Sequence, residues 1–209
     1  MDKSFAVWPA MPRSQEASGY PHQVKNLLAI VRVIAASTGR NTQDLDDFTA
    51  HFDGRLAALG RTQHMLSRAD AFEIDLEELV RDELLAHGEK HPQVEGPDIF
   101  LSQKAAETLG LALHELATNA VKFGALTNAG SLKVAWRIDA DWLVLEWRET
   151  GVPAVDPYPA KWGFGRDWIE RGLPYQLGGE SRMEFLPGGV ACTIRLPLDH
   201  AARPGGDNP

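Results

Sequence analysis

Residues 111–126 read LALHELATNAVKFGAL, and this stretch predicts more about the chain than any other. At the roughly 100° per residue of an α-helix, Glu115, Asn119 and Lys122 fall within about 60° of one another. The opposite side of the same helix is apolar and consists of Leu109, Leu113, Leu116, Ala117 and Ala120. One side therefore predicts packing against a sheet, while the other presents a carboxylate, an amide and an ammonium.

These three polar groups are sparse and chemically varied, which suits a ligand better than bulk water. An amide oxygen such as that of Asn119 can complete the shell of a Mg²⁺ that otherwise holds water and phosphate oxygens. Lys122, one turn further on, can meet phosphates as a point charge. An amphipathic helix that merely covers a sheet is the alternative interpretation of this segment taken alone.

The composition limits the classes of protein. The chain has 209 residues, and its 44% hydrophobic and 24% charged residues are typical of a soluble globular protein with one ordinary domain or two small ones. The net charge of −8 argues against a nucleic-acid partner. No apolar run approaches the roughly 20 residues of a membrane span. Cys192, the single cysteine, lies in an apolar run, so we expect it in a buried strand of a cytoplasmic protein.

The first 70 residues predict a helical hairpin after a flexible leader over residues 1–19. A helix is expected over 21–38 and a second over 44–67, joined by a short turn. The apolar stripe of the first helix is expected to contain Val24, Leu27, Leu28, Val31 and Ala35. A hairpin domain over 20–70 buries too little surface alone, so it either pairs with a second copy as a four-helix bundle or folds back on its own domain.

The second part, residues 71–200, predicts an α+β domain of antiparallel strands with helices on one face. Helices are expected over 72–85 and 166–177, and strands over 98–102, 131–138, 142–149, 180–185 and 189–196. The tail from residue 201 is expected to be disordered. His87 and His91 have the spacing of metal ligands, but Gly88 and Pro92 disfavour a helix that would hold both on one face.

The stretch HELATNAVKFGAL resembles the N box of the HWE subfamily of bacterial histidine kinases, and Trp147-Arg148-Glu149 matches the Trp-x-Glu that completes the subfamily's name. The resemblance spans about residues 21–198, with the motifs in family order. It implies a GHKL (Bergerat-type) α/β sandwich that binds ATP, preceded by a dimerisation and phosphotransfer hairpin.

The resemblance also implies roles for individual residues. Asn119 would chelate Mg²⁺, Glu115 would position a water or proton near the γ-phosphate, and Lys122 and His114 would contact phosphates. Glu149 would accept a hydrogen bond from the adenine amine.

Glycines accompany these side chains. Gly151 would let the backbone approach the base, although Val152 stands where the family usually has a second glycine. Gly163 and Gly165 resemble the second glycine box, beside a helix N-terminus that suits phosphate. The loop over 153–162 would be the lid of the nucleotide site.

The stretch HQVKNLLA, residues 22–29, resembles the phospho-acceptor box of the same kinases. A neutral imidazole is a competent nucleophile toward a γ-phosphoryl group, so His22 would be the acceptor and Asn26, one turn on, would orient it. Gln23 replaces the arginine that usually follows the histidine.

The resulting hypothesis is an ATP-dependent protein histidine kinase, with ATP and Mg²⁺ as cofactors and the receiver domain of a response regulator as partner. We expect a homodimer, and a sensor supplied by another chain or by a longer form of this one. Two alternatives remain open. One is a phosphotransfer or regulator-binding protein with a degenerate ATP site, motivated by Val152 and Gln23, and the other is a serine kinase or ATPase of the same fold.

Overall fold

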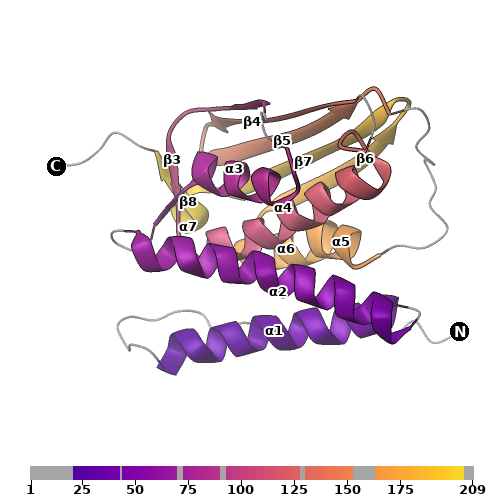
Figure 1. Cartoon of the computed structure of the whole chain (residues 1–209). Helices are drawn as coiled ribbons and strands as arrows, with labels where there is room; N and C mark the ends of the chain where they lie inside the picture. The colour runs from indigo at the N-terminus through magenta and orange to yellow at the C-terminus, as the bar shows by residue number, and fades with distance from the viewer. Residues whose placement is uncertain are drawn as a thin grey trace, which may run out of the picture. The chain divides into compact units, whose positions relative to one another are not determined.

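The computed structural model describes residues 21–42, 44–69, 73–89, 93–127, 130–152 and 163–204 (Figure 1). Within those ranges, none of the helices combines the length and hydropathy that a membrane-spanning segment needs. The chain forms two compact units, of which the first ends at Ala57 and the second begins at Ala58. The expected leader over residues 1–19 lies outside the described residues.

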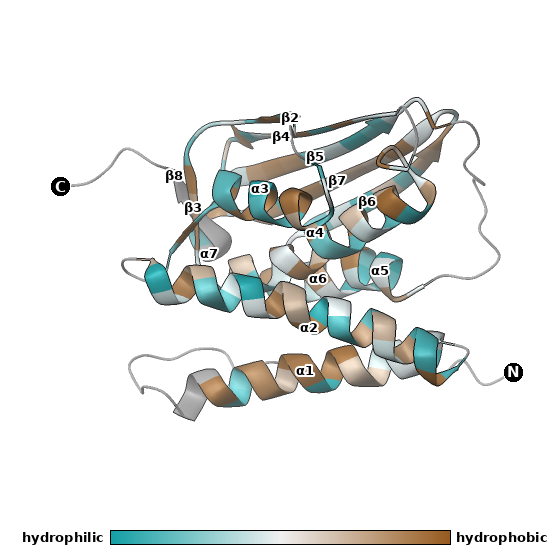
Figure 2. Cartoon of the chain, in the orientation of Figure 1, coloured by the Kyte–Doolittle hydropathy of each residue, from teal (hydrophilic) through white to brown (hydrophobic). Residues whose placement is uncertain are grey.

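The first unit contains α1 (Pro21–Asn41) and the first half of α2 (Leu45–Arg68), as the hairpin prediction requires. Ile30 and Ile34 are buried, and the middle of α1 is hydrophobic (Figure 2). Buried Arg55 donates a hydrogen bond from Nη1 to the hydroxyl of Thr38 at 2.7 Å, which ties α2 to α1. The predicted stripe is only partly right, because Val24 and Leu28 are 46% and 58% exposed.

The second unit contains a five-stranded sheet in the order β2-β4-β5-β7-β6. Its strands are β2 (Gln93–Glu95), β4 (Ser131–Asp139), β5 (Trp142–Thr150), β6 (Glu180–Leu186) and β7 (Gly189–Pro197). All pairs are antiparallel except β2 with β4, and β2 is too short and too exposed to be seen in the sequence. Cys192 lies in register with Trp147 and is buried, as predicted, and burial raises the pKa of its thiol.

Helices cover one face of this sheet, as Figure 1 shows for α3, α4, α5 and α6. Their bounds are α3 (Leu76–Ala86), α4 (Gln103–Phe123), α5 (Phe164–Asp167), the π-helical turn η2 (Trp168–Gly172) and α6 (Leu173–Leu177). The last three follow one another directly and together replace the single helix predicted over 166–177. This arrangement confirms the α+β class with helices on one side.

A smaller sheet in the order β1-β3-β8 corrects the prediction for the tail. Its strands are β1 (Ile74–Asp75), β3 (Ile99–Leu101) and β8 (Ala202–Pro204), and α7 (Leu198–Ala201) precedes β8. The tail was expected to be disordered from residue 201, yet β8 pairs antiparallel with β3, a pairing that the short local sequence does not reveal. The rest of the tail, residues 205–209, lies outside the described residues.

The boundary between the two units falls inside α2, whereas the sequence placed it near residue 70. The second half of α2 makes hydrogen bonds within the second unit. Arg61 binds Glu83 of α3, and Gln63 donates to Glu107 of α4 at 2.6 Å. Gly110 lets α4 approach α2 closely, since a Cβ at this position would lie 2.7 Å from the Thr62 hydroxyl. Polar contacts therefore assign this half of α2 to the second unit.

Candidate functional site

Helix α4 carries the N-box sequence and is held at both ends. Its N-cap, Ser102, accepts a hydrogen bond from the amide of Ala105 at 3.3 Å, and the amide of the C-cap Gly124 donates to the carbonyl of Ala120. The predicted apolar side is confirmed, because each of these residues is at most 1% exposed: Leu109, Leu113, Leu116, Ala117 and Ala120. Burial of this side fixes which polar groups of α4 face elsewhere.

Glu115, Asn119 and Lys122 define the Asn119 side of α4. Glu115 is buried, Asn119 is half-buried and Lys122 is exposed in the last turn. In the part of the chain that the structure describes, the side-chain amide of Asn119 makes no hydrogen bond. A half-buried amide without a protein partner is available to a ligand, and oxygen from such an amide is a normal ligand of Mg²⁺.

The second glycine box lies against the Asn119 side. A Cβ at Gly165 would be 2.6 Å from Oε2 and 3.0 Å from Cβ of Glu115, so a side chain at this position would displace the Glu115 carboxylate. Gly163 is the N-cap of α5 and has open space where a Cβ would be. The predicted lid over 153–162 lies outside the described residues.

Glu149, at the end of β5, is buried beside the C-terminal end of α4. Its Oε2 accepts from the amide of Ala125 at 2.8 Å, and its Oε1 accepts from Nε1 of Trp147 at 3.0 Å. Burial raises the pKa of this carboxyl, and the two hydrogen bonds oppose the shift. A carboxylate has about four acceptor positions, so two remain for a ligand amine.

The chain around Glu149 is closely packed. A Cβ at Gly124 would lie 2.0 Å from Oε2 of Glu149, so glycine is required there. Gly151 has φ +77°, a left-handed conformation that favours glycine. Val152 is 3% exposed, and its amide donates to the carbonyl of Gly188 at 3.0 Å. Val152 therefore packs inward at the position where the family usually has glycine.

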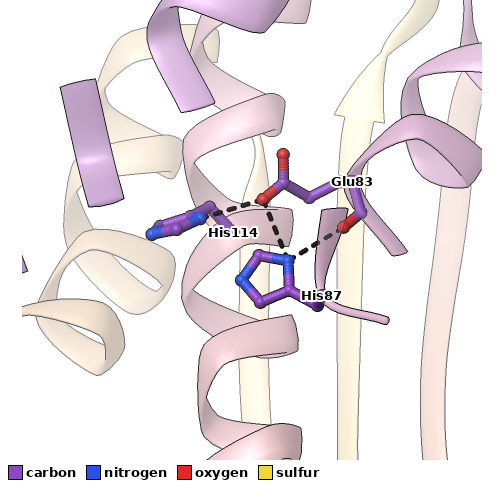
Figure 3. Close-up of side chains that lie close together, drawn as sticks. All are labelled: Glu83, His87 and His114. Atoms are coloured by element: carbon purple, nitrogen blue, oxygen red, sulfur yellow. Dashed lines mark hydrogen bonds and ion pairs between the residues drawn. The ribbon is translucent and has the colours of Figure 1, made fainter. Parts of the chain in front are cut away.

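His114 points to a different side of α4, which we call the paired side and define by Glu107, His114 and Thr118. Figure 3 shows its ring facing Glu83 of α3. Nδ1 of His114 lies 2.9 Å from Oε1 of Glu83, and because a carboxylate only accepts, Nδ1 carries the proton and donates. The predicted phosphate contact of His114 receives no support from this placement and stays a prediction.

Glu83 is the centre of the contacts on the paired side. Nη2 of Arg61 lies 2.7 Å from Oε1 and 2.6 Å from Oε2 of Glu83, whose side chain is 4% exposed. Burial alone would raise the pKa of Glu83, but hydrogen bonds from His114 and Arg61 outweigh burial and lower it from the ordinary 4.5. Glu83 is therefore an ionised carboxylate between a guanidinium and an imidazole.

His87 completes the group that Figure 3 draws. Its Nδ1 donates to the main-chain carbonyl of Glu83 at 2.8 Å, which leaves Nε2 to accept from the Thr118 hydroxyl at 3.2 Å. Burial lowers the pKa of His87 from 6.5, and the nearby His114 and Arg61 add to this, whereas Glu83 opposes it.

Glu83, His87 and His114 each offer one ligand atom within 4.8 Å of the others, which raises the question of a metal ion. The contacts answer it. Arg61 holds both oxygens of Glu83, so a divalent ion would have to displace or face a guanidinium. Each Nδ1 already donates to an oxygen of Glu83. We therefore assign the group as a hydrogen-bond network. His91, the other histidine with metal-like spacing, lies outside the described residues.

Two members of this network, Arg61 and Glu83, were missed by the sequence reasoning. They lie 22 and 31 residues from their partners, Glu83 and His114, on helices whose relative rotation no local pattern reveals. The available signal was weak: a glutamate at a position of α3 that faces the core.

The predicted phospho-acceptor lies in the first turn of α1. The side chain of His22 is outside the described residues, so its surroundings are not described. Asn26 is half-buried on the next turn of the same helix.

A five-stranded sheet covered by helices on one side, with an N-box helix and two glycine boxes, defines the class of histidine kinase cores. Solved structures agree on the fold. The Erythrobacter litoralis EL346 blue-light activated histidine kinase matches with a TM-score of 0.58 at 21% identity, over 85% of this chain and 60% of that one. Its separate kinase domain matches with a TM-score of 0.58 at 16% identity, over 83% and 85%.

Sequence comparison narrows the class to a family. The family model of HWE histidine kinases matches residues 20–98. Blue-light-activated histidine kinase 1 of Erythrobacter litoralis (strain HTCC2594) is 33% identical over 85% of this chain and 51% of its own length. The blue-light-activated histidine kinase of Brucella ovis is 31% identical over 88% of this chain and 39% of its own. These matches support the assignment of the chain to the HWE histidine kinase family, and the chain spans about half or less of the length of these relatives.

Proposed function

We propose that the chain binds ATP with Mg²⁺ at the Asn119 side of α4 and transfers the γ-phosphoryl group to His22. The observation that carries the proposal is the half-buried Asn119 amide, one turn from Glu115 and without a hydrogen bond among the described residues. Glu149 lies beside the C-terminal end of α4, and its carboxylate keeps acceptor positions for the adenine amine.

The chemistry follows from these groups. Asn119 would hold a Mg²⁺, which neutralises charge on the phosphates and leaves room for water and phosphate oxygens. Lys122 would meet the phosphates, and Glu115 would position a water or proton. The bond between the γ-phosphorus and its bridging oxygen breaks, ADP leaves with that electron pair, a P–N bond forms at His22, and the imidazole releases its proton.

The phosphohistidine would then react with a carboxylate. An aspartate of a response regulator receiver domain attacks the phosphorus, the P–N bond breaks, and an acyl phosphate forms while His22 is regenerated. This partner and the use of ATP imply a cytoplasmic location.

Labelling with γ-labelled ATP tests the proposal. The wild-type protein should take up acid-labile, alkali-stable label, and His22→Ala and Asn119→Ala should reduce it by more than about 100-fold. His64→Ala, an exposed histidine of α2, is the matched control and should keep the label. Undiminished label in either of the first two variants would contradict the assignment.

Buried Val152 favours one alternative, a phosphotransfer module whose ATP site has decayed. That protein would bind no ADP by calorimetry, yet His22 would exchange phosphoryl groups with a phosphorylated receiver domain. The same calorimetry with and without Mg²⁺ separates the two functions.

We also propose a homodimer formed through the hairpin. Val24, Leu28 and Leu45 are 46%, 58% and 75% exposed, and large apolar side chains exposed on one helical unit support a partner surface. Light scattering should give twice the 23.0 kDa mass of the chain, and Leu28→Glu should reduce the measured mass to that of a single chain. A sensor on another chain remains part of the proposal.

A further inference from the structure

We propose that Glu83 is a positioning residue for α4, which holds Arg61 and His114 at once and thereby fixes the rotation of the helix that carries Glu115 and Asn119. The proposal rests on the function proposed above and adds residues that no motif contains. Glu83 lies on α3, on the paired side of α4, and has no place in the candidate nucleotide site itself.

The contacts join three helices through one carboxylate. Arg61 comes from the second half of α2, Glu83 from α3 and His114 from α4. The donor–acceptor distances are 2.6–2.9 Å, in the range of charge-assisted hydrogen bonds. The carboxylate is nearly buried, so water competes little for these bonds.

These hydrogen bonds are directional, and they therefore restrict the rotation of α4 in a way that apolar packing does not. The buried leucines and alanines of α4 hold it against its neighbours, but apolar attraction is non-directional and tolerates small rotations. Side-chain ends lie about 5 Å from a helix axis, so a rotation of about 10° moves them by about 1 Å. A displacement of about 1 Å at a catalytic group can cost about 100-fold in rate.

The position of His114 makes the effect specific. It immediately precedes Glu115, so its ring and the Glu115 carboxylate leave α4 about 100° apart. Any rotation of α4 that lengthens the bond from His114 to Glu83 therefore also shifts Glu115 relative to Gly165, which it contacts closely. Fixing one ring fixes the neighbouring carboxylate.

A second buried carboxylate provides the matched comparison. Glu107 lies on the same paired side, two turns before His114, and accepts from Gln63 of α2 at 2.6 Å and from Gln103 at 2.8 Å. It also joins α2 to α4, but its partners are neutral amides, and burial raises its pKa while these bonds oppose the shift. If the protein simply needs buried carboxylates, changes at Glu83 and Glu107 should reduce activity equally. If Glu83 positions α4 through His114, only the change at Glu83 should reduce activity.

The first measurement is the tautomer of His114 in the protein without nucleotide, read from the ¹⁵N shifts of its ring. In the wild-type protein Nδ1 should carry the proton. Glu83→Gln keeps the shape but offers a neutral amide, and His114 should then become a mixture of tautomers. Glu107→Gln should leave the ring unchanged.

The second measurement is autophosphorylation with varied ATP. Glu83→Gln should lower kcat by about 10–100-fold while KM for ATP changes less than about threefold, because the adenine contact belongs to Glu149 on β5. Glu107→Gln should change kcat less than twofold. Arg61→Lys keeps a cation but loses the guanidinium geometry, and an intermediate loss of kcat is expected.

Several outcomes would overturn the proposal. An unchanged His114 tautomer in Glu83→Gln does so, and so does a kcat of Glu83→Gln within twofold of wild type. An equal loss of kcat in Glu107→Gln also overturns it. Should Glu83→Gln fail to fold, Arg61→Lys decides by its kcat, and a kcat within twofold of wild type overturns the proposal. Should the wild-type protein take no label, the proposed function fails separately, and the tautomer alone decides the role of Glu83.

Discussion

The two polar sides of α4 differ in what their side chains contact. On the paired side, Glu107, His114 and Thr118 each make hydrogen bonds to neighbouring helices or the loop after α3. On the Asn119 side, Glu115 packs against Gly165, the side-chain amide of Asn119 has no hydrogen bond among the described residues, and Lys122 is exposed. Polar groups that are hydrogen-bonded to neighbouring elements hold the helix in place, whereas the side-chain amide of Asn119, which has no such bond among the described residues, is available to a ligand. Changes on the first side should affect stability, and changes on the second should affect binding.

The largest effect is expected from Arg61→Ala. This change leaves the buried Glu83 carboxylate without its cation, and the free energy of unfolding should fall by about 3 kcal/mol. Arg137→Ala is the control, since Arg137 and Glu146 form an ion pair whose side chains are 55% and 48% exposed. Its loss should be at most about 1 kcal/mol in the same urea titration. Equal losses of unfolding free energy in the two variants would mean that the contact between Arg61 and Glu83 stabilises the fold no more than an exposed ion pair does.

The next effect concerns pH. The pKa of Glu83 is lowered from 4.5, so its contribution to stability is present above that value and is lost as the pH falls through the lower folded pKa. The pKa of His87 is also lowered, from 6.5, so the unfolded chain binds this proton more readily and stability declines below that pH.

Glu83→Gln separates these two contributions. The stability difference between wild type and this variant should be greatest near neutral pH and should shrink below pH 4.5, whereas the decline that begins near pH 6.5 should remain in both proteins. Urea titrations from about pH 7 to pH 3.5 measure both effects. A difference that is independent of pH would exclude an ionised Glu83.

A smaller effect is expected from Glu149→Gln, where the two kinds of role meet. One carboxylate oxygen becomes an amide that faces the N–H of Ala125 or of Trp147, so stability should fall by about 1–2 kcal/mol. ADP affinity should also fall about tenfold if the remaining acceptor positions hold the adenine amine.

Asn119→Ala sharpens the contrast, because it should change stability by less than about 0.5 kcal/mol while Mg²⁺-dependent binding is lost. Calorimetry and urea titration on both variants give the comparison.

The sequence predicted most elements because their signals are local. The period of apolar residues in α4 gave its buried side, and alternation around residues 139–141 gave the β4–β5 pair. The short strands β1, β2 and β8 were missed, since two or three residues carry no period and depend on pairing with a distant strand.

The site was predicted unevenly for a related reason. Glu115 and Asn119 share a side of one helix, so spacing alone placed them together. The orientation of His114 depends on Glu83, which is 31 residues away. A helical pattern tells which residues share a side, but it does not tell which partner each side meets.

The smallest effects are expected at the second glycine box, where two glycines provide a matched pair. Gly163→Ala places a Cβ in open space, and alanine is a somewhat poorer N-cap than glycine, so stability should fall by about 0.5 kcal/mol. Gly165→Ala places a Cβ 2.6 Å from Oε2 of Glu115, a strain of about 1–3 kcal/mol that better helix propensity offsets by about 1 kcal/mol. Because the Glu115 carboxylate must move, Gly165→Ala should also reduce autophosphorylation. In Gly163→Ala the Glu115 carboxylate stays in place, so any change in label reports only on the main-chain amide proposed to approach the phosphate. If Gly165→Ala labels as well as Gly163→Ala, the contact between Gly165 and Glu115 does not contribute to the reaction, and the Asn119 side would then be a binding surface for nucleotide without a catalytic carboxylate.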